Sequence, residues 1–488
     1  MKRYVRALAW LLAGAQLPAG PASAADFTSN LRRSIAIAGH ENERFSLAER
    51  MRHYRVPAVS VAVVQGCRII EARAFGAAAP SRRATTHTLF QAGSISKTFT
   101  AVAALRLVEQ GILSLDGDVR PRLTSWRLPD SPLLEGRSVT LRGLLSHTAG
   151  INQEGGLGYA RHAPLPTLAD ILEGRPPANT PPIRVVRRPG TEWLYSGGGY
   201  YIIQTLMQDA TGRDYGQIMR RLVFRPLGLH DSSFAQPLDA RHDALAAQAA
   251  GPDGAPLAGG WRVNPELAAG GLWTTPGDVA RMLIAIAHST RSEHGALLGP
   301  VAAGQMMTRG PGNWGLGVDL GQPGYTLRFG HTGHNVGFAS EYVMFPRTCQ
   351  GAVVMTSADE GGWLVTEILR AIGDSYGWPD RTPPPVQTAI PLTSAIAARF
   401  VGTYRLRDFP AERFTISRRP SGLYWARVGH IGRDLLPEAQ DRLFSPDSRM
   451  ILEAPDRGAG PATALTLSFG GGLNVAERVG DGEPHPAP

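Results

Sequence analysis

The stretch GSISKTFTA, residues 93–101, places Ser94 three residues before Lys97. On a helix these side chains share one face, and a serine at a helix start lies near the positive end of the helix dipole and near free backbone N–H groups. A hydroxyl and an amine so placed could perform nucleophilic catalysis, with the lysine as proton acceptor or as the charge that primes another base. The alternative is ordinary helix capping beside a surface lysine, which the same spacing allows.

Lysine is rare in this chain, because only Lys2 and Lys97 are lysines among the 50 lysine and arginine residues. Lys2 belongs to a stretch with the pattern of a cleavable leader. Arginine stays protonated at neutral pH, whereas a desolvated lysine can lower its pKa and transfer a proton. Retention of Lys97 just before an apolar helical pattern therefore favours a chemical role over compositional drift.

Two further segments place polar side chains at the ends of regular elements. PGTEWLYSGGGYYIIQ puts Tyr195 on a glycine-rich turn that enters an apolar helix, and RFGHTGHNVGF puts His331, Thr332 and Gly333 at the end of a strand. Taken singly, such a tyrosine is more often a core residue and such a histidine more often a surface residue. Their occurrence together, in chain order after the serine and lysine, favours one shared site.

The remaining sequence must position these motifs, and it predicts strands at both ends of a large unit with helices between. Residues 57–76 have the apolar alternation of two strands joined near Gly66 and Cys67, and residues 101–111 repeat apolar positions at helical spacing. Later segments predict four strands and a closing helix: 314–320, 326–333, 337–345, 349–357 and 362–377. Strands that meet only late in the chain favour an α+β domain over a series of βαβ units.

A second unit follows a proline-rich segment. Residues 378–392 include three consecutive prolines, which is typical of a semi-rigid linker. Beyond it, short alternating stretches separated by turn residues predict a small antiparallel β domain over residues 393–479. Residues 480–488 are expected to be a disordered tail.

Taken in order, the motifs resemble the serine β-lactamase and penicillin-binding protein superfamily, most closely the class C β-lactamase branch with its esterase and peptidase relatives. The family pattern is Ser-x-x-Lys, then Tyr-x-Asn, then Lys-Thr-Gly or His-Thr-Gly, and residues 94–97, 195–197 and 331–333 occupy those places. Supporting segments also resemble the family: 141–151, 223–234 and 270–283.

The resemblance implies an architecture for the whole chain. Residues 25–377 would form a β-lactamase/transpeptidase-like serine hydrolase domain, with an antiparallel sheet flanked by helices and an added helical subdomain. The carboxy-terminal segment resembles the lipocalin-like β domain often appended to such hydrolases, and would form a small β-barrel-like domain.

The resemblance also assigns roles to the motif residues. Ser94 would be the nucleophile that forms an acyl-enzyme, and Lys97 would lower the pKa of its neighbours. Tyr195 would be the general base for acylation and for the deacylating water, a task that needs a nearby cation because the ordinary tyrosine pKa is near 10. The backbone N–H groups of Ser94 and His334 would form the oxyanion hole beside the substrate-binding strand 331–333.

Two departures from the family pattern bear on the substrate. Gly197 stands where the family often has an asparagine that binds the substrate's acylamide, and His331 replaces the lysine that helps to hold the substrate carboxylate. We therefore expect a serine hydrolase acting on ester, amide or β-lactam bonds of small substrates, with esterase-like activity favoured. The alternatives are a β-lactamase or D-Ala-D-Ala carboxypeptidase acting on peptidoglycan peptides, and an inactive homologue that binds such ligands as a sensor.

The two cysteines, Cys67 and Cys349, can also be placed by the resemblance. In the family's sheet the first strand lies antiparallel beside the last one, so the end of the strand before Cys67 would adjoin the start of the strand after Cys349. An exported chain would oxidise such a pair to a disulfide. The alternative is two unpaired half-buried thiols, because a one-residue error in register turns the side chains apart.

The start of the chain predicts export. Residues 1–24 combine basic residues, a short apolar run at 7–17 and small residues before a cleavage site after Ala24, as in a secretory signal. The run is too short to span a bilayer, so we expect a periplasmic or secreted protein with no stable membrane anchor. A chain of 488 residues with 43% hydrophobic and 19% charged residues predicts a large globular domain plus a smaller one.

No motif predicts a metal ion or a cofactor. His331 and His334 lie three residues apart without an HExxH motif or a cysteine cluster, and the glycines of residues 315–321 lack GxGxxG spacing. The net charge is +9, but the arginines are scattered, so no nucleic-acid partner is expected. The expected partner is a small-molecule substrate, and the oligomeric state is left open.

Overall fold

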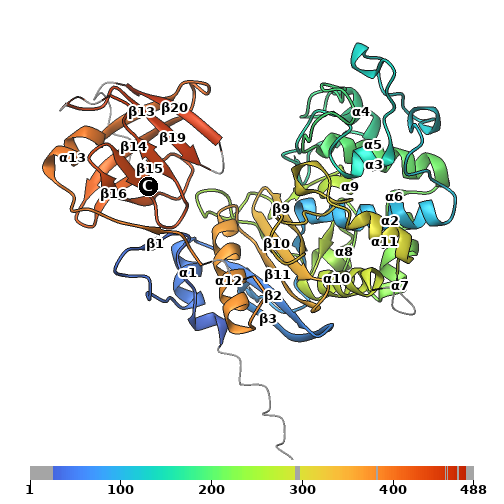
Figure 1. The fold of residues 1–488 in the computed structure, drawn as a ribbon, viewed down its shortest axis with the longest axis horizontal. Coiled ribbons are helices and arrows are strands. Elements are labelled where there is room, and N and C mark those ends of the chain that lie inside the picture. The colour runs from blue at the N-terminus through green and yellow to red at the C-terminus, as the bar shows by residue number, and fades with distance from the viewer. Residues whose placement is uncertain are drawn as a thin grey trace, which may run out of the picture.

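The computed structural model describes residues 26–291, 297–380, 383–456, 458, 460–469 and 472–479. It contains an α+β body and a closed β-barrel that lies at one end of this body (Figure 1). This arrangement confirms the predicted fold class. The expected leader, residues 1–24, and the expected tail, residues 480–488, lie outside the described residues.

The body is organised around a six-stranded antiparallel sheet. In order across the sheet, the strands are β4 (Arg82–Arg83), β3 (Arg68–Ala79), β2 (Ala58–Gln65), β11 (Gln350–Thr356), β10 (Phe338–Phe345) and β9 (Phe329–Asn335). The first hairpin of the body, β2–β3, is thus joined to its last hairpin, β10–β11, through the β2–β11 ladder, in which Val61 lies opposite Val354. Strand β9 forms one edge of the sheet, so half of its backbone polar groups face away from β10.

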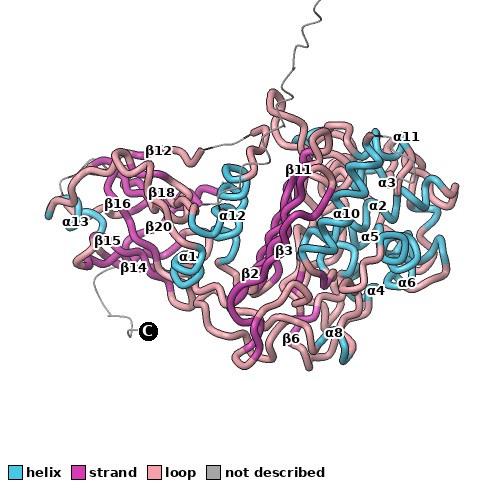
Figure 2. The backbone as a smooth tube through the Cα atoms, turned by 90° about the horizontal axis from the view of Figure 1, so that it is seen from below, coloured by secondary structure: helices cyan, strands magenta, loops and turns pink. Residues whose placement is uncertain are grey.

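Helices cover both faces of the sheet because successive side chains of β2 point to opposite faces and nearly all are apolar. Val59, Val61 and Val63 pack in a cluster with α12 (Gly361–Ser375). Ala58, Ala62 and Val64 belong instead to the larger cluster that contains α2 (Ser96–Glu109) and α10 (Pro276–Thr290). Figure 2 shows the sheet as a layer between these two groups of helices.

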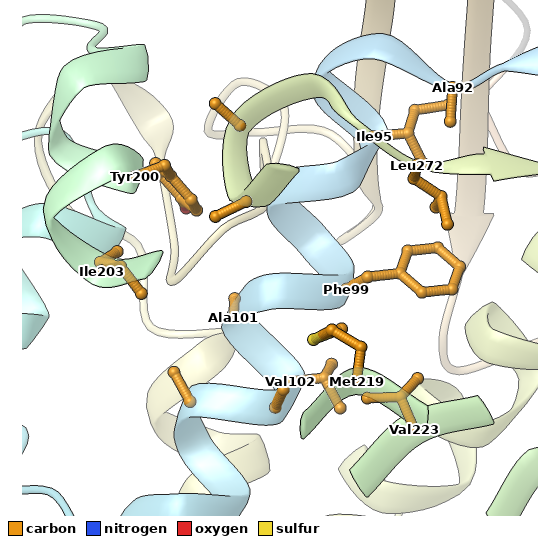
Figure 3. Packing of buried hydrophobic residues seen from close by; sticks show 14 of the residues in the cluster. Ala92, Ile95, Phe99, Ala101, Val102, Tyr200, Ile203, Met219, Val223 and Leu272 are labelled. Carbon is orange, nitrogen blue, oxygen red and sulfur yellow. The ribbon is translucent and has the colours of Figure 1, made fainter. Parts of the chain in front are cut away.

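Helix α2 lies in the middle of the larger cluster and is buried from Ser96 to Leu105. Phe99 and Val102 lie beside Met219 and Val223, while Tyr200 and Ile203 approach from α5 (Figure 3). A helix that is apolar on nearly all sides must be enclosed by other elements. Helices α5 (Gly197–Thr211), α6 (Tyr215–Met219) and α9 (Leu267–Gly270) contact it. The other helices of the predicted helical subdomain are α3 (Leu141–Leu145), α4 (Leu168–Glu173), α7 (Arg225–Leu227), α8 (Ala240–Asp243) and α11 (Pro300–Met306).

Two short ladders tie distant loops together near the start of α2. Strand β5 (Phe90–Gln91), just before Ser94, pairs with β8 (Trp273–Thr274), which follows α9. Strands β6 (Tyr159–Ala160) and β7 (Arg262–Val263) form the second ladder. Among the described residues, no helix is long and apolar enough to cross a membrane.

The carboxy-terminal unit is an eight-stranded antiparallel barrel that closes where its first strand pairs with its last. It is preceded by α13 (Ser394–Phe400), and its interior is filled by apolar side chains such as Phe414, Leu435 and Leu452. Its strands are β13 (Gly402–Leu406), β14 (Arg413–Arg419), β15 (Gly422–Arg427), β16 (Arg433–Ala439), β17 (Arg442–Phe444), β18 (Ile451–Glu453), β19 (Ala464–Phe469) and β20 (Gly472–Val479).

The barrel is joined to the body by a buried ion-pair network. Nη2 of Arg50, in α1 (Leu47–His53), donates to Oε1 of Glu367 in α12 and to Oδ1 of Asp447 in the barrel, both at 2.6 Å. The proline-rich segment is also held in place, because β12 (Val386–Gln387) pairs in parallel with β1 (Ala36–Ile37).

One predicted strand is wrong. Residues 314–320 form only isolated bridges, from Trp314 to Asp319 and from Asp319 to Gly330. Gly317 has a φ of +76° and its α-carbon packs directly on Ala101 of α2, so the segment turns toward the helix instead of extending along the sheet. The pattern also missed β16, β17 and β20, whose alternation is interrupted by polar and charged residues.

Cys67 and Cys349 are joined by a disulfide, with their α-carbons 5.0 Å apart. Both residues have positive φ and lie in hairpin turns just outside the ladder, Cys67 between β2 and β3 and Cys349 between β10 and β11. The antiparallel pairing of β2 with β11 brings these two turns together, and the backbone N–H of Cys67 donates to the carbonyl oxygen of Cys349 at 3.2 Å.

Candidate active site

Ser94 lies in a single 3₁₀ turn, Gly93–Ile95, that leads directly into α2. The turn begins at Gly93, whose φ is +52° and on which a Cβ would lie 2.5 Å from the backbone nitrogen of His334. Only glycine tolerates both conditions. The turn therefore holds the half-buried Ser94 beside the edge strand β9, with the backbone of His334 next to it.

Lys97 is the second residue of α2 and is buried. Its Nζ donates hydrogen bonds to Oγ of Ser94 at 2.9 Å and to the carbonyl oxygen of Ala269 in α9 at 3.0 Å. Burial lowers the pKa of the ammonium group to about 7, against a small opposing effect of the Glu154 carboxylate. A substantial fraction of Lys97 is therefore a neutral amine at neutral pH, beside the serine hydroxyl.

Tyr195 stands over the same pair, with its ring centroid 5.0 Å from Nζ of Lys97. The expectation that Lys97 lowers the pKa of Tyr195 is not met. Burial raises the pKa of this phenol, although its hydrogen bond with Ser94 opposes the shift. The reason is that burial of the phenol disfavours the charged phenolate, and Lys97 is not among the groups that shift this pKa.

His147 is a site residue to which the sequence motifs assigned no role. Its Nδ1 accepts a hydrogen bond from the backbone N–H of Ser196 at 3.1 Å, and its carbonyl oxygen accepts one from Leu194 at 2.8 Å. These two bonds hold the turn that carries Tyr195, whose ring centroid lies 4.4 Å from that of His147. Burial, with a smaller effect of the neighbouring Lys97, keeps the pKa of His147 well below its ordinary value, so its ring is neutral.

Strand β9 places the residues of the third motif differently from one another. His331 is buried, with its ring centroid 6.3 Å from that of Tyr195, whereas Thr332 is exposed. Burial and the nearby Lys97 lower the pKa of His331 to about 3, so its ring carries no charge at neutral pH. Gly333 packs against the carbonyl of Ala92, and His334 is exposed and lines the pocket at Ser94.

Gly197 begins α5 directly behind Tyr195 and has no room for a side chain. A Cβ there would lie 2.6 Å from the carbonyl oxygen of Glu154, which already accepts a hydrogen bond from the Gly197 backbone N–H at 3.0 Å. Residues 152–155 thus occupy part of the space that a longer side chain would need. The residue is glycine for a steric reason, in addition to lacking the family's amide.

A hydrogen-bonded group of three side chains, Gln91, Asn264 and Asn335, lies at the pocket. Oε1 of Gln91 accepts hydrogen bonds from Nδ2 of Asn264 at 2.9 Å and from Nδ2 of Asn335 at 2.7 Å. Asn264 and Asn335 line the pocket together with Glu266, a buried acid. No motif or periodicity singled out these residues, because they come from separate segments and meet only in the folded chain.

The structure brings Ser94, Lys97, Tyr195 and the backbone of His334 into one site. His331 contacts this site through the ring of Tyr195, and Gly197 supports the turn on which Tyr195 lies. A hydroxyl nucleophile, a buried amine at hydrogen-bond distance and a protonated phenol are sufficient for acyl transfer. The side chains present can also move protons without a metal ion.

Comparisons with known proteins find similar sequences over the α+β body. The family profile described as Beta-lactamase matches residues 46–375. Penicillin-binding protein 4 of Amycolatopsis lactamdurans is 28% identical over 315 residues, which cover 59% of this chain and 77% of that protein. The D-alanyl-D-alanine-carboxypeptidase/endopeptidase AmpH of Escherichia coli (strain K12) is 23% identical over 307 residues, which cover 58% of this chain and 75% of that protein.

A solved structure extends the similarity to the whole fold. The octameric penicillin-binding protein homologue from Pyrococcus abyssi superposes with a TM-score of 0.57 at 21% identity. The superposition covers 88% of this chain and 98% of that one, so it includes the barrel as well as the α+β body.

Proposed function

This chain belongs to the beta-lactamase family and is a serine hydrolase, and we propose that it is a periplasmic or secreted enzyme that forms an acyl-enzyme on Ser94. Its substrates would be small molecules with an ester, amide or β-lactam bond, and esters would be preferred. The observation that carries the proposal is the 2.9 Å contact between Nζ of Lys97 and Oγ of Ser94 in a buried site.

In the proposed acylation step, Oγ of Ser94 attacks the substrate carbonyl carbon while its proton moves to the neutral amine of Lys97. The carbonyl oxygen becomes an oxyanion, held by the backbone N–H groups of Ser94 and His334. When the tetrahedral intermediate collapses, the bond to the leaving group breaks and the leaving group takes a proton through the hydroxyl of Tyr195. Lys97 then returns its proton to Tyr195. The product of these steps is an ester between the acyl group and Ser94.

Deacylation reverses these transfers with water as the nucleophile. The water gives a proton to the neutral amine of Lys97 as it attacks the acyl carbon, and Oγ of Ser94 takes a proton back from the ammonium of Lys97 as it leaves. The reaction as proposed needs no metal ion or cofactor, because nucleophile, proton acceptor and oxyanion donors all belong to the chain.

The preference for esters rests on two features of the site. The neutral ring of His331 lacks the positive charge with which a lysine would bind a substrate carboxylate, as penicillins and D-Ala-D-Ala peptides carry. Gly197 offers no amide to a substrate acylamide and cannot be replaced by a longer residue without moving residues 152–155. Small uncharged esters require neither contact.

The first experiment is labelling with a fluorophosphonate probe, followed by peptide mass spectrometry. The peptide containing Ser94 should gain the mass of the probe, and Ser94→Ala should lose both labelling and turnover, while the exposed Ser125→Ala keeps both. Label on another residue, or turnover by Ser94→Ala, would reject the acyl-enzyme. A stable adduct that is never hydrolysed would identify a sensor instead of an enzyme.

The second experiment compares substrates side by side: p-nitrophenyl esters, nitrocefin and D-Ala-D-Ala peptides. Ester turnover should exceed the other two. The carboxypeptidase alternative, suggested by the name of the Escherichia coli relative, would be favoured by faster release of D-alanine. Export is tested separately, by sequencing the amino terminus of the protein recovered from the periplasm or medium.

A further inference from the structure

A buried acid with one unpartnered carboxyl oxygen lies in the pocket beside Ser94. Glu266 is 3% exposed and lines this pocket with Ser94 and Lys97. Its Oε1 is buried and has no hydrogen-bond partner among the described residues. A buried carboxyl oxygen without a hydrogen bond or a counter-charge is costly, so an unsatisfied oxygen at a pocket points to a partner that binds there.

A second unpartnered polar atom faces the same space. The hydroxyl of Tyr201, one residue after Tyr200 in α5, is buried and also lacks a hydrogen-bond partner among the described residues. Tyr201 lines the pocket with Glu266, and the two groups are close enough that the Glu266 charge contributes to raising the pKa of the phenol, after burial as the main cause.

The backbone around Glu266 is rigid and is part of the catalytic scaffold. Glu266 directly precedes α9, the helix whose Ala269 carbonyl oxygen accepts the hydrogen bond from Lys97. The backbone N–H of Ala268 donates to Oε1 of Gln204 at 3.0 Å, and the carbonyl oxygen of Ala268 accepts from Thr100 at 2.8 Å. These bonds fix α9 between α2 and α5, so the carboxyl group is held at a set position relative to Ser94.

We propose that Glu266 and Tyr201 bind a primary ammonium group on the acyl part of the substrate. This inference rests on the proposed Ser94 acyl-enzyme and narrows its substrate to esters or amides of small amino acids with a free amine. The ammonium would donate hydrogen bonds to Oε1 of Glu266 and to the hydroxyl oxygen of Tyr201, and would thereby give both atoms a hydrogen-bond partner.

The chemistry of the pocket selects this group over the alternatives. A substrate carboxylate would be repelled by Glu266, and an alkyl group would leave both polar atoms unpaired in an apolar contact. Lys97 is the only lysine or arginine among the described residues that line the pocket, and its Nζ is already bonded to Ser94 and Ala269. Burial raises the pKa of Glu266 to about 7, and a bound ammonium group would favour its ionised form.

The test uses benzyl esters, which share one leaving group, so that rate differences report on the acyl part. The esters of D-alanine, L-alanine and β-alanine carry the amine, and benzyl propionate is the control with the same carbon chain and no amine. The kcat/KM of the wild-type enzyme at pH 7 should be at least about tenfold higher for one of the amine-bearing esters than for benzyl propionate, the scale of a hydrogen bond to a charged group.

The quantity to compare between variants is the kcat/KM of the preferred amine-bearing ester divided by that of benzyl propionate. This ratio should fall at least about tenfold in Glu266→Gln, which keeps the shape of the side chain and removes its charge. The matched control is Glu135→Gln, which removes the same charge at an exposed position and should keep the wild-type ratio. Thermal melting checks that both variants fold. Tyr201→Phe, which deletes only the second acceptor, should lower the ratio by a smaller factor.

Two outcomes would overturn the inference: no preference for any amine-bearing ester in the wild-type enzyme, or an unchanged preference in folded Glu266→Gln. Failure of the proposed function itself would look different. In that case benzyl propionate and p-nitrophenyl esters would also remain intact, and the fluorophosphonate probe would not label Ser94.

Discussion

The α-carbon of Gly197 lies so close to the carbonyl oxygen of Glu154 that a Cβ would be 2.6 Å from it. The two residues face each other across the turn that carries Tyr195, and the hydrogen bond between their backbones holds the segment 152–155 against the start of α5. Substrate preference at this position is therefore set by backbone packing as well as by the missing side chain.

Gly197→Asn should not create efficient β-lactam hydrolysis. The new side chain must push back the backbone at Glu154, which we expect to cost about 1 to 3 kcal/mol of unfolding free energy and to lower ester turnover by shifting Tyr195. Thermal melting and nitrocefin assays measure both effects. Gly304→Ala is the control, because a Cβ there meets nothing within 4 Å, and faster nitrocefin turnover by Gly197→Asn would contradict the steric account.

Lys97→Arg should lower the rate of acylation by at least about a hundredfold, the scale of a lost general acid–base contribution. Arginine keeps a positive charge but cannot accept the proton of Ser94 near neutral pH. Stopped-flow measurement of the p-nitrophenol burst gives the rate, and circular dichroism checks the fold. Near-normal acylation by a folded Lys97→Arg protein would mean that charge alone is needed.

The rate of acylation should rise with pH through about 7. Burial lowers the pKa of Lys97 to about 7, and only the deprotonated amine can accept a proton, so kcat/KM for a neutral ester should increase about tenfold per pH unit below 7 and level off above it. The pKa of Glu266 is raised to about 7 and could give the same inflection. The inflection should therefore persist in Glu266→Gln, and its disappearance there would assign it to Glu266.

Loss of the disulfide should destabilise the body of the protein. Cys67 and Cys349 are 282 residues apart in sequence. Closing so long a loop lowers the entropy of the unfolded chain, which raises the free energy of unfolding by at most about 5 kcal/mol. Urea unfolding of the double variant Cys67→Ser, Cys349→Ser should show this loss. Two alkylatable cysteines in wild-type protein that is unfolded without reductant would exclude the bond.

Asp447→Asn should weaken the attachment of the barrel to the body. The substitution leaves the buried guanidinium of Arg50 with one carboxylate fewer, a change that costs about 3 to 5 kcal/mol at buried pairs. Calorimetry should detect a lower melting temperature. Asp116→Asn is the control, because its pair with Arg142 is on the surface and is worth less than about 1 kcal/mol.

The same carboxylate predicts an acid limit for the interface. Although burial opposes ionisation, the hydrogen bond from His53 and the charges of Arg50 and Arg33 hold the pKa of Asp447 well below its usual range. A lowered folded-state pKa stabilises the protein fully above the ordinary aspartate pKa, and the stabilisation is lost as the pH falls below about 4. The melting temperature of the wild type should fall over that range more steeply than that of Asp447→Asn.

The sequence alone determined the features that depend on local spacing. Ser94 and Lys97 lie one helical turn apart whatever surrounds them, and the turn before α5 carries Tyr195 because glycines follow it. The alternation in β2, β10 and β11 predicted strands at the two ends of the body, and the family resemblance predicted how they pair. By contrast, residues 314–320 alternate like a strand but pack on α2, because tertiary contact at Gly317 overrides the local pattern.

Only the tertiary structure decided the electrostatics of the site. The pKa of Lys97 depends on burial in the folded chain, which no local spacing encodes, and burial likewise raises the pKa of Tyr195 instead of lowering it. His147 acquires its role from a hydrogen bond to Ser196, 49 residues away in sequence. Glu266 is one acid among many along the chain, and what distinguishes it is a buried carboxyl oxygen without a partner at the pocket beside Ser94. This is a property of three-dimensional packing that a sequence pattern does not contain.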